Sequence, residues 1–275
     1  MSLNFARPLL ALILAAASLH AAAAPVGGRV FGPGTPFFEA DLGQRSEADR
    51  QSIELWLQPA AGAQDGAVIV DKLSPATGYG IRLEMTGAGR VRMIVNGGRR
   101  LETASVLPTD RPSHLLAAFD AREKTVALYV DGRLDASLPV DPKRKIEAAG
   151  VYSPLRVGAD LSGTHRFAGT IAYLAVHPRA ATAVNAARLF AASGPAPDAV
   201  DAWHMAKGAD GRIASALGRT ALATPSTISA LSTAPANALT LWYPRPAREW
   251  LESLPSAMAA WAAPCSAASN ANASS

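Results

Sequence analysis

Short stretches in which apolar and polar residues alternate, separated by turn-forming residues, run from Arg45 to about Val176. In the first, residues 52–57 (SIELWL), the isoleucine and both leucines fall on one face, and Glu54 and Trp56 fall on the other. Alternation with period two is typical of a strand that buries one side and exposes the other. The chain is therefore restricted to folds built from sheets with one buried face.

A hairpin is the clearest local prediction. Residues 80–85 (GIRLEM) and 90–95 (RVRMIV) are joined by residues 86–89 (TGAG), whose two glycines accept a positive φ. The apolar residues of both segments share one face, whereas the other face carries the charged residues Arg82, Glu84, Arg90 and Arg92. We expect this hairpin to have one face in the core and one in water.

Further short strands follow the same pattern, and turn signals separate them. They are expected at residues 67–70, 114–119, 125–130, 133–138, 155–157, 169–176 and 201–205. Residues 180–192 (AATAVNAARLFAA) are the one clear helical candidate. Many short strands without βαβ alternation predict an all-β fold, a two-sheet antiparallel sandwich with one short helix.

The two ends of the chain do not fit this pattern. Residues 1–23 contain Arg7, a short apolar run and small residues up to the expected cleavage site, which is typical of a signal peptide. An uncleaved membrane anchor is the alternative. We expect a protein that is secreted or periplasmic, with no membrane contact after cleavage. Residues 224–238 are rich in Ser, Thr, Ala and Pro and indicate a linker after a sandwich at residues 24–223.

Several of these blocks, in the same order, resemble the bacterial laminin-G/concanavalin A-like domain. The blocks are SIELWLQP from Ser52, GYGIRLEMTGAGRVRMIV from Gly78, HLLAAFD from His114, VALYVDG from Val126, LRVGAD from Leu155 and FAGTIAYLAV from Phe167. The resemblance covers about residues 31–190 and includes the short helix after the last strand. It implies a concanavalin A-like jelly roll, a fold that serves both as a glycan binder and as a protein-interaction module.

A second resemblance lies near the carboxyl end. Residues 239–255 (LTLWYPRPAREWLESLP) are similar to the opening strand of glycoside hydrolase family 95, the α-L-fucosidase-like enzymes. Residues 257–275 do not resemble that family, but a one-base shift of frame converts one choice of their codons into a family-like continuation. We therefore interpret residues 239–275 as a truncated enzyme start, out of frame after residue 255, and expect a disordered C-terminal tail there.

The sequence offers little reactive chemistry. Most acidic residues fall in expected turns, including Asp71 and Asp160, where carboxylates usually shape the turn. The histidines are too far apart for a metal-ligand motif, and His114 is expected to be a packed or edge residue. A Ca²⁺ site built from loop acids such as Asp71 or Asp160 remains open, because their spacing does not define one. We predict no catalytic residues and no cofactor.

Composition limits the partners. The formal net charge is +4, but the basic residues are scattered and form one tight cluster, at residues 143–145, without interleaved aromatics. This argues against nucleic acid. The single cysteine, Cys265, excludes a disulfide within the chain. Oligomeric state is not predicted.

The functional hypothesis that follows is a non-catalytic accessory module that binds a polysaccharide or glycoconjugate. Its candidate ligand-binding residues are Tyr129, Arg82, Glu84 and Arg92, which share one face if the strands pair as drawn. An aromatic platform beside polar groups suits a sugar. The alternatives are a structural or protein-interaction sandwich without sugar binding, and an enzyme in its own right.

Overall fold

The structure is a computed structural model of the whole chain. It describes residues 24–25, 27–43, 50–74, 80–95, 99–139, 153–192, 194–206, 208–209 and 211–225. The expected signal peptide, nearly all of the expected linker and the expected disordered tail at residues 239–275 lie outside these ranges.

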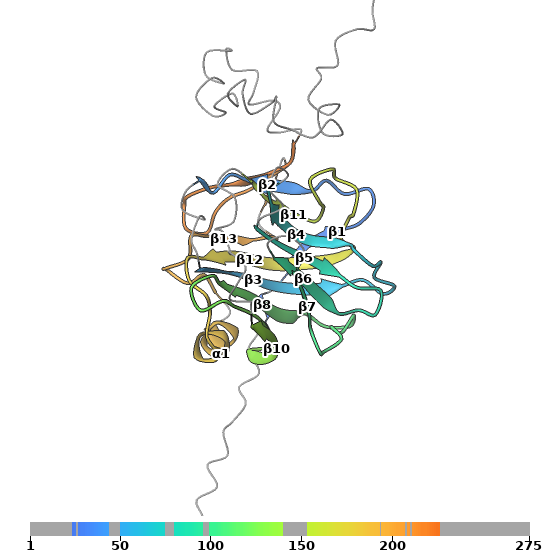
Figure 1. Cartoon of the computed structure of the whole chain (residues 1–275). Coiled ribbons are helices and arrows are strands. Elements are labelled where there is room, and N and C mark those ends of the chain that lie inside the picture. The colour runs from blue at the N-terminus through green and yellow to red at the C-terminus, as the bar shows by residue number, and fades with distance from the viewer. Residues whose placement is uncertain are drawn as a thin grey trace, which may run out of the picture. The chain divides into compact units, whose positions relative to one another are not determined.

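The first of two sheets in the described part of the chain has seven strands. Six run in the order β1-β12-β3-β8-β9-β10, and β13 pairs with β12 (Figure 1). The strands are β1 (Arg29–Phe31), β3 (Arg50–Pro59), β8 (Ser113–Asp120), β9 (Thr125–Val130), β10 (Arg133–Pro139), β12 (Gly169–His177) and β13 (Asp201–His204). All of these pairs are antiparallel.

The second sheet has nine described strands in the order β14-β15-β16-β2-β11-β4-β5-β6-β7. The strands are β2 (Phe38–Ala40), β4 (Val68–Leu73), β5 (Gly80–Met85), β6 (Val91–Val95), β7 (Arg99–Glu102), β11 (Leu155–Val157), β14 (Gly208–Ala209), β15 (Arg212–Ile213) and β16 (Leu222–Ala223). These pairs are antiparallel too.

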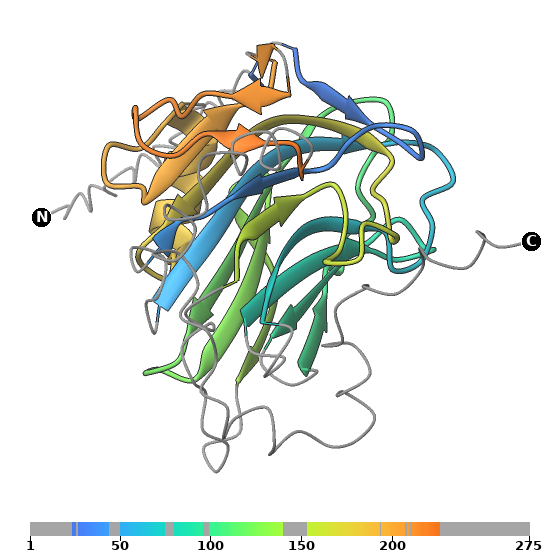
Figure 2. The ribbon, with the colours of Figure 1, turned by 90° about the horizontal axis from the view of Figure 1, so that it is seen from above.

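The two sheets form separate layers (Figure 2) and share one hydrophobic core. Ile53 and Leu55 of β3 contribute to it from one sheet, and Leu83 of β5 and Met93 of β6 contribute from the other. Because side chains alternate along a strand, their sequence neighbours lie on the outer faces. The predicted all-β, two-sheet antiparallel sandwich is therefore confirmed, and so is the 80–95 hairpin, which is β5 and β6.

The expected helix is also formed, although it is shorter than predicted. Helix α1 (Ala183–Ala192) begins three residues later, since the Thr182 hydroxyl accepts a hydrogen bond of 3.4 Å from the backbone N–H of Asn185. Thr182 is thus the N-cap of the helix. The helix lies beside β10 at the bottom of Figure 1. No helix in the described ranges is both long and apolar enough to cross a bilayer.

The outer face of the seven-stranded sheet is largely covered. Ala186 and Leu189 of α1 pack on Leu116 of β8 and Tyr129 of β9, and a second cluster buries Trp56 beneath the ring of Phe190. Charged side chains are instead concentrated on the outer face of the nine-stranded sheet, so that face is the better candidate for a polar ligand.

Candidate functional site

Charged residues from five adjacent strands line the outer face of the nine-stranded sheet. We call the following set the polar face: Glu39 of β2, Arg156 of β11, Asp71 of β4, Arg82 and Glu84 of β5, and Arg92 of β6. Alternation puts them there, because the residues beside them in each strand, such as Ile81 and Leu83, point into the core.

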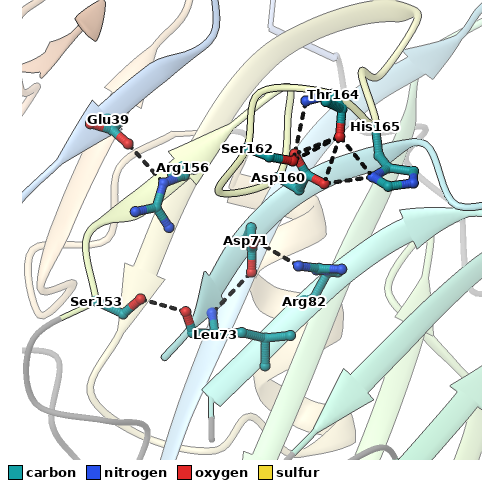
Figure 3. A network of polar contacts seen from close by, with 10 residues as sticks. All are labelled: Glu39, Asp71, Leu73, Arg82, Ser153, Arg156, Asp160, Ser162, Thr164 and His165. Atoms are coloured by element: carbon teal, nitrogen blue, oxygen red, sulfur yellow. Dashed lines mark hydrogen bonds and ion pairs between the residues drawn. The ribbon is translucent and has the colours of Figure 1, made fainter. Parts of the chain in front are cut away.

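Four of these residues form a row across the sheet. The register pairs Arg156 with Glu39 on one side and Asp71 on the other, and pairs Asp71 with Arg82. The Nε of Arg156 donates to Glu39 Oε1 at 2.7 Å, and Nη2 of Arg82 donates to Asp71 Oδ2 at 3.0 Å (Figure 3). Asp71 Oδ1 also accepts the Leu73 backbone N–H at 3.0 Å. Carboxylates and guanidinium groups thus alternate along the row.

Both arginines of the row have donors that the protein does not use. Nη1 of Arg156 and Nε of Arg82 are buried, and neither has a hydrogen-bond acceptor. The side chain of Arg156 is 5% exposed and that of Arg82 is 25% exposed. Most buried polar groups in folded proteins have a partner, so an acceptor oxygen that reached this row would complete two donors that are now unpaired.

Arg92 forms ion pairs with a second group of charged residues beside the row. Its guanidinium donates to Glu102 Oε1 at 2.7 Å, to Glu84 Oε1 at 2.8 Å and to Asp65 Oδ1 at 3.3 Å. The hydrogen bonds to Glu102 and Glu84 raise the pKa of Arg92, so its positive charge is fixed. Asp65 and Glu102 are 66% and 43% exposed, which leaves this end of the face open to solvent.

The loop after β11 carries another polar cluster, centred on Asp160 (Figure 3). Its carboxylate accepts hydrogen bonds from the Ser162 hydroxyl at 2.8 Å, the Thr164 N–H at 2.9 Å and Nδ1 of His165 at 2.5 Å. Burial raises the pKa of Asp160, but these hydrogen bonds outweigh burial and hold it well below its usual range. His165 is 62% exposed.

The two acids considered for Ca²⁺ are both engaged by protein donors. Asp160 shapes its loop, as expected for a turn acid, whereas Asp71 lies inside strand β4 and pairs with Arg82, so its placement in a turn was wrong. Among the residues that the structure describes, no group of three or more His, Cys, Asp or Glu is placed to hold a metal ion.

Three of the four predicted ligand-binding residues lie together. Arg82, Glu84 and Arg92 share the polar face, and Glu84 and Arg92 form an ion pair at 2.8 Å. Tyr129 does not join them. Strand β9 belongs to the other sheet, where Tyr129 is 6% exposed, packs against α1 and donates to the Ala181 carbonyl at 3.2 Å. The prediction of a shared face is wrong because hairpin-by-hairpin pairing does not show where the chain changes sheet.

Tyr129 does line a pocket of its own. A pocket of about 320 Å³ lies where α1 begins, with Ala118, Ala127 and Tyr129 among its lining residues and Asp120 and Glu123 beside them. The tyrosine hydroxyl is already satisfied within the protein by the Ala181 carbonyl.

Distant histidines meet around Glu54 on the covered side of the seven-stranded sheet. Glu54 accepts from Nε2 of His114 at 3.1 Å and Nε2 of His177 at 2.8 Å. All three side chains are at most 9% exposed, and Phe190 packs on His114. The expectation that His114 is packed is confirmed. Sequence spacing could not show this cluster, because strand pairing alone brings its members together.

Comparison with known proteins identifies the fold. The model of the concanavalin A-like lectin/glucanases superfamily (Laminin_G_3) matches residues 39–187, more than half of the chain. The chain belongs to this superfamily. The predicted concanavalin A-like jelly roll is thereby confirmed for the lectin-like domain. No curated protein is similar enough in sequence to count as a relative.

Solved structures share the fold of the lectin-like domain at low sequence identity. A candidate carbohydrate-binding protein from Bacteroides ovatus is 16% identical, with 71% of this chain and 57% of that chain covered, at a TM-score of 0.58. The chain thus spans little more than half the length of that protein. A heptameric SAP-like pentraxin from Limulus polyphemus is 12% identical, with 71% and 93% covered, at 0.50.

Proposed function

We propose that the chain is a secreted, non-catalytic accessory module that binds glycans through its polar face. The observation that carries the proposal is the row of alternating arginines and carboxylates, in which Arg82 and Glu39 are partly exposed and two buried guanidinium donors have no acceptor. Such a row matches a sugar, since each hydroxyl both donates and accepts. Membership of a lectin-containing superfamily and the likeness to a candidate carbohydrate-binding protein support this use of the fold.

The proposal is tested with the whole chain on a glycan array, followed by calorimetry at millimolar sugar. We expect binding, and we expect Arg82→Lys to weaken it about tenfold, because lysine keeps the charge beside Asp71 but lacks the Nε donor and the planar fork. The matched control is Arg188→Lys, an exposed arginine of α1 on the other sheet's side. Absence of binding to all glycans would favour the protein-interaction alternative.

We extend the proposal to the origin of the chain. The similarity of residues 239–255 to the start of family 95 glycoside hydrolases supports a module that precedes an α-L-fucosidase-like enzyme. The nucleotide sequence around codon 256 tests this: a family-like continuation in a shifted frame is expected, and unrelated codons would contradict it. Hydrolysis of an aryl fucoside by the purified chain would contradict the non-catalytic role.

The secreted location is tested separately. The apolar run and small residues of 1–23 support cleavage near Ala23. Amino-terminal sequencing of the exported protein should therefore begin close to residue 24. A mature protein that retains Met1 in the membrane fraction would favour the uncleaved anchor instead.

A further inference from the structure

The positive charges of the polar face are all compensated by neighbouring carboxylates. Every one of its arginines already touches at least one carboxylate within 3.0 Å. The described pairs are Arg82 with Asp71, Arg156 with Glu39, and Arg92 with Glu84, Glu102 and Asp65. Three guanidinium groups thus share five carboxylates, so the paired part of the face has no positive charge left for an anion.

Two neighbouring cations whose side chains the structure describes, Arg90 and Arg100, do not change this balance at the row. Arg90 directs its guanidinium to the backbone carbonyls of Thr103 and Ala104. Arg100 is exposed on the edge strand β7, where the register places Ile94 of β6 between it and Arg82. A ligand carboxylate or sulfate at Arg82 would therefore lie beside Asp71 and meet like charge.

The unused hydrogen-bonding groups also favour a neutral ligand over an anionic one. Arg82 and Arg156 have spare N–H donors, and an ionised carboxylate such as Glu39 has more acceptor sites than the one that Arg156 fills. An anionic ligand group supplies acceptors only and cannot donate to the remaining acceptor sites of the carboxylates. A hydroxyl supplies both functions, which suits a surface where donors and acceptors alternate.

Building on the proposed glycan function, we infer that the polar face selects neutral glycans and discriminates against acidic ones. Neutral sugar hydroxyls accept hydrogen bonds from Arg82 and donate to Glu39, the two partly exposed side chains of the row, while the buried Asp71 and Arg156 hold them in place. Side-chain exposure of 20% at Glu39 and 25% at Arg82 gives access to the row from both ends. Glu39 and Arg82 should then make the first contacts with the sugar.

Matched ligands test the inference with the whole chain. Neutral galactosides and fucosides are compared with their sialylated and sulfated forms, and we expect the neutral form to bind about tenfold more tightly or better. Its affinity should also change little between low and high salt, because no net charge is neutralised on binding. Tighter binding of the acidic forms would overturn this inference while leaving the glycan function intact. Failure of every glycan to bind would overturn both.

A variant that removes one negative charge tests whether the selectivity comes from the polar face. Glu102→Gln removes one carboxylate from Arg92 while Glu84 still pairs with it, so the preference for the neutral form should fall several-fold. Glu123→Gln, an exposed acid in the turn after β8 on the other sheet, is the matched control and should leave the ratio of affinities unchanged. An equal ratio in Glu102→Gln and wild type would assign the selectivity to another surface.

Discussion

At the residue scale, Glu54 is a buried carboxylate whose stability in the fold depends on its hydrogen-bond partners. It is fully buried and accepts hydrogen bonds from two histidines on neighbouring strands. Glu54→Gln keeps the shape but removes the charge and one acceptor, which should lower the free energy of unfolding by about 3 kcal/mol. Urea denaturation measures this. Glu123→Gln, which is exposed, is the control and should shift the midpoint very little.

Glu54 also predicts an acid dependence. Burial would raise its pKa, but hydrogen bonds and charge from His114 and His177 outweigh burial and lower the pKa below its ordinary value of 4.5. The folded state then binds its proton less readily than the unfolded state, so the stabilisation is present above about pH 4.5 and is lost as pH falls through the folded pKa. The unfolding free energy of wild type should fall more steeply with acid than that of Glu54→Gln, and parallel curves would contradict this.

Some residues of the polar face could be predicted because the local sequence pattern places them, and others could not. Arg82, Glu84 and Arg92 alternate with core residues in a hairpin closed by a short turn, so their common face follows from the sequence. The apolar run before Asp71 predicts a strand that ends at residue 70, although Asp71 and Lys72 both lie in β4. Nothing local indicates that Glu39 would meet Arg156, since only the β2–β11 pairing joins them.

At the element scale, the longer strands were predictable, whereas most of the shortest ones were not, apart from β11 and β13. Strands such as β3 and β8 carry enough alternating residues to show their period. The described strands β14, β15 and β16 have two residues each, and β2 has three after a Gly- and Pro-containing stretch. These strands exist because a neighbouring edge pairs with them, so tertiary context, rather than local propensity, determines them.

Helix α1 gives a prediction at the same scale. Leu189 is buried against the outer face of the seven-stranded sheet, whereas Val184 on the same helix is 78% exposed. Leu189→Ala should cost about 2–4 kcal/mol because it leaves a cavity over Leu116 and Tyr129. Val184→Ala removes a similar kind of side chain from solvent and should change stability by less than about 0.5 kcal/mol. Thermal unfolding of the pair tests whether α1 is part of the cooperative fold, and equal melting temperatures would show that it is not.

At the scale of the whole molecule, both sheets contribute to a single core, so they should unfold together. A chain of residues 24–225 tests this, because it keeps every described strand and removes Trp242, Trp250 and Trp261. Its fluorescence then comes from Trp56, on the covered outer face, and Trp203, in the core. Circular dichroism at the β-sheet band and tryptophan fluorescence should give the same urea midpoint. Two separate midpoints would contradict a single cooperative unit and would show that the surroundings of Trp56 or Trp203 unfold separately from the bulk of the sheets.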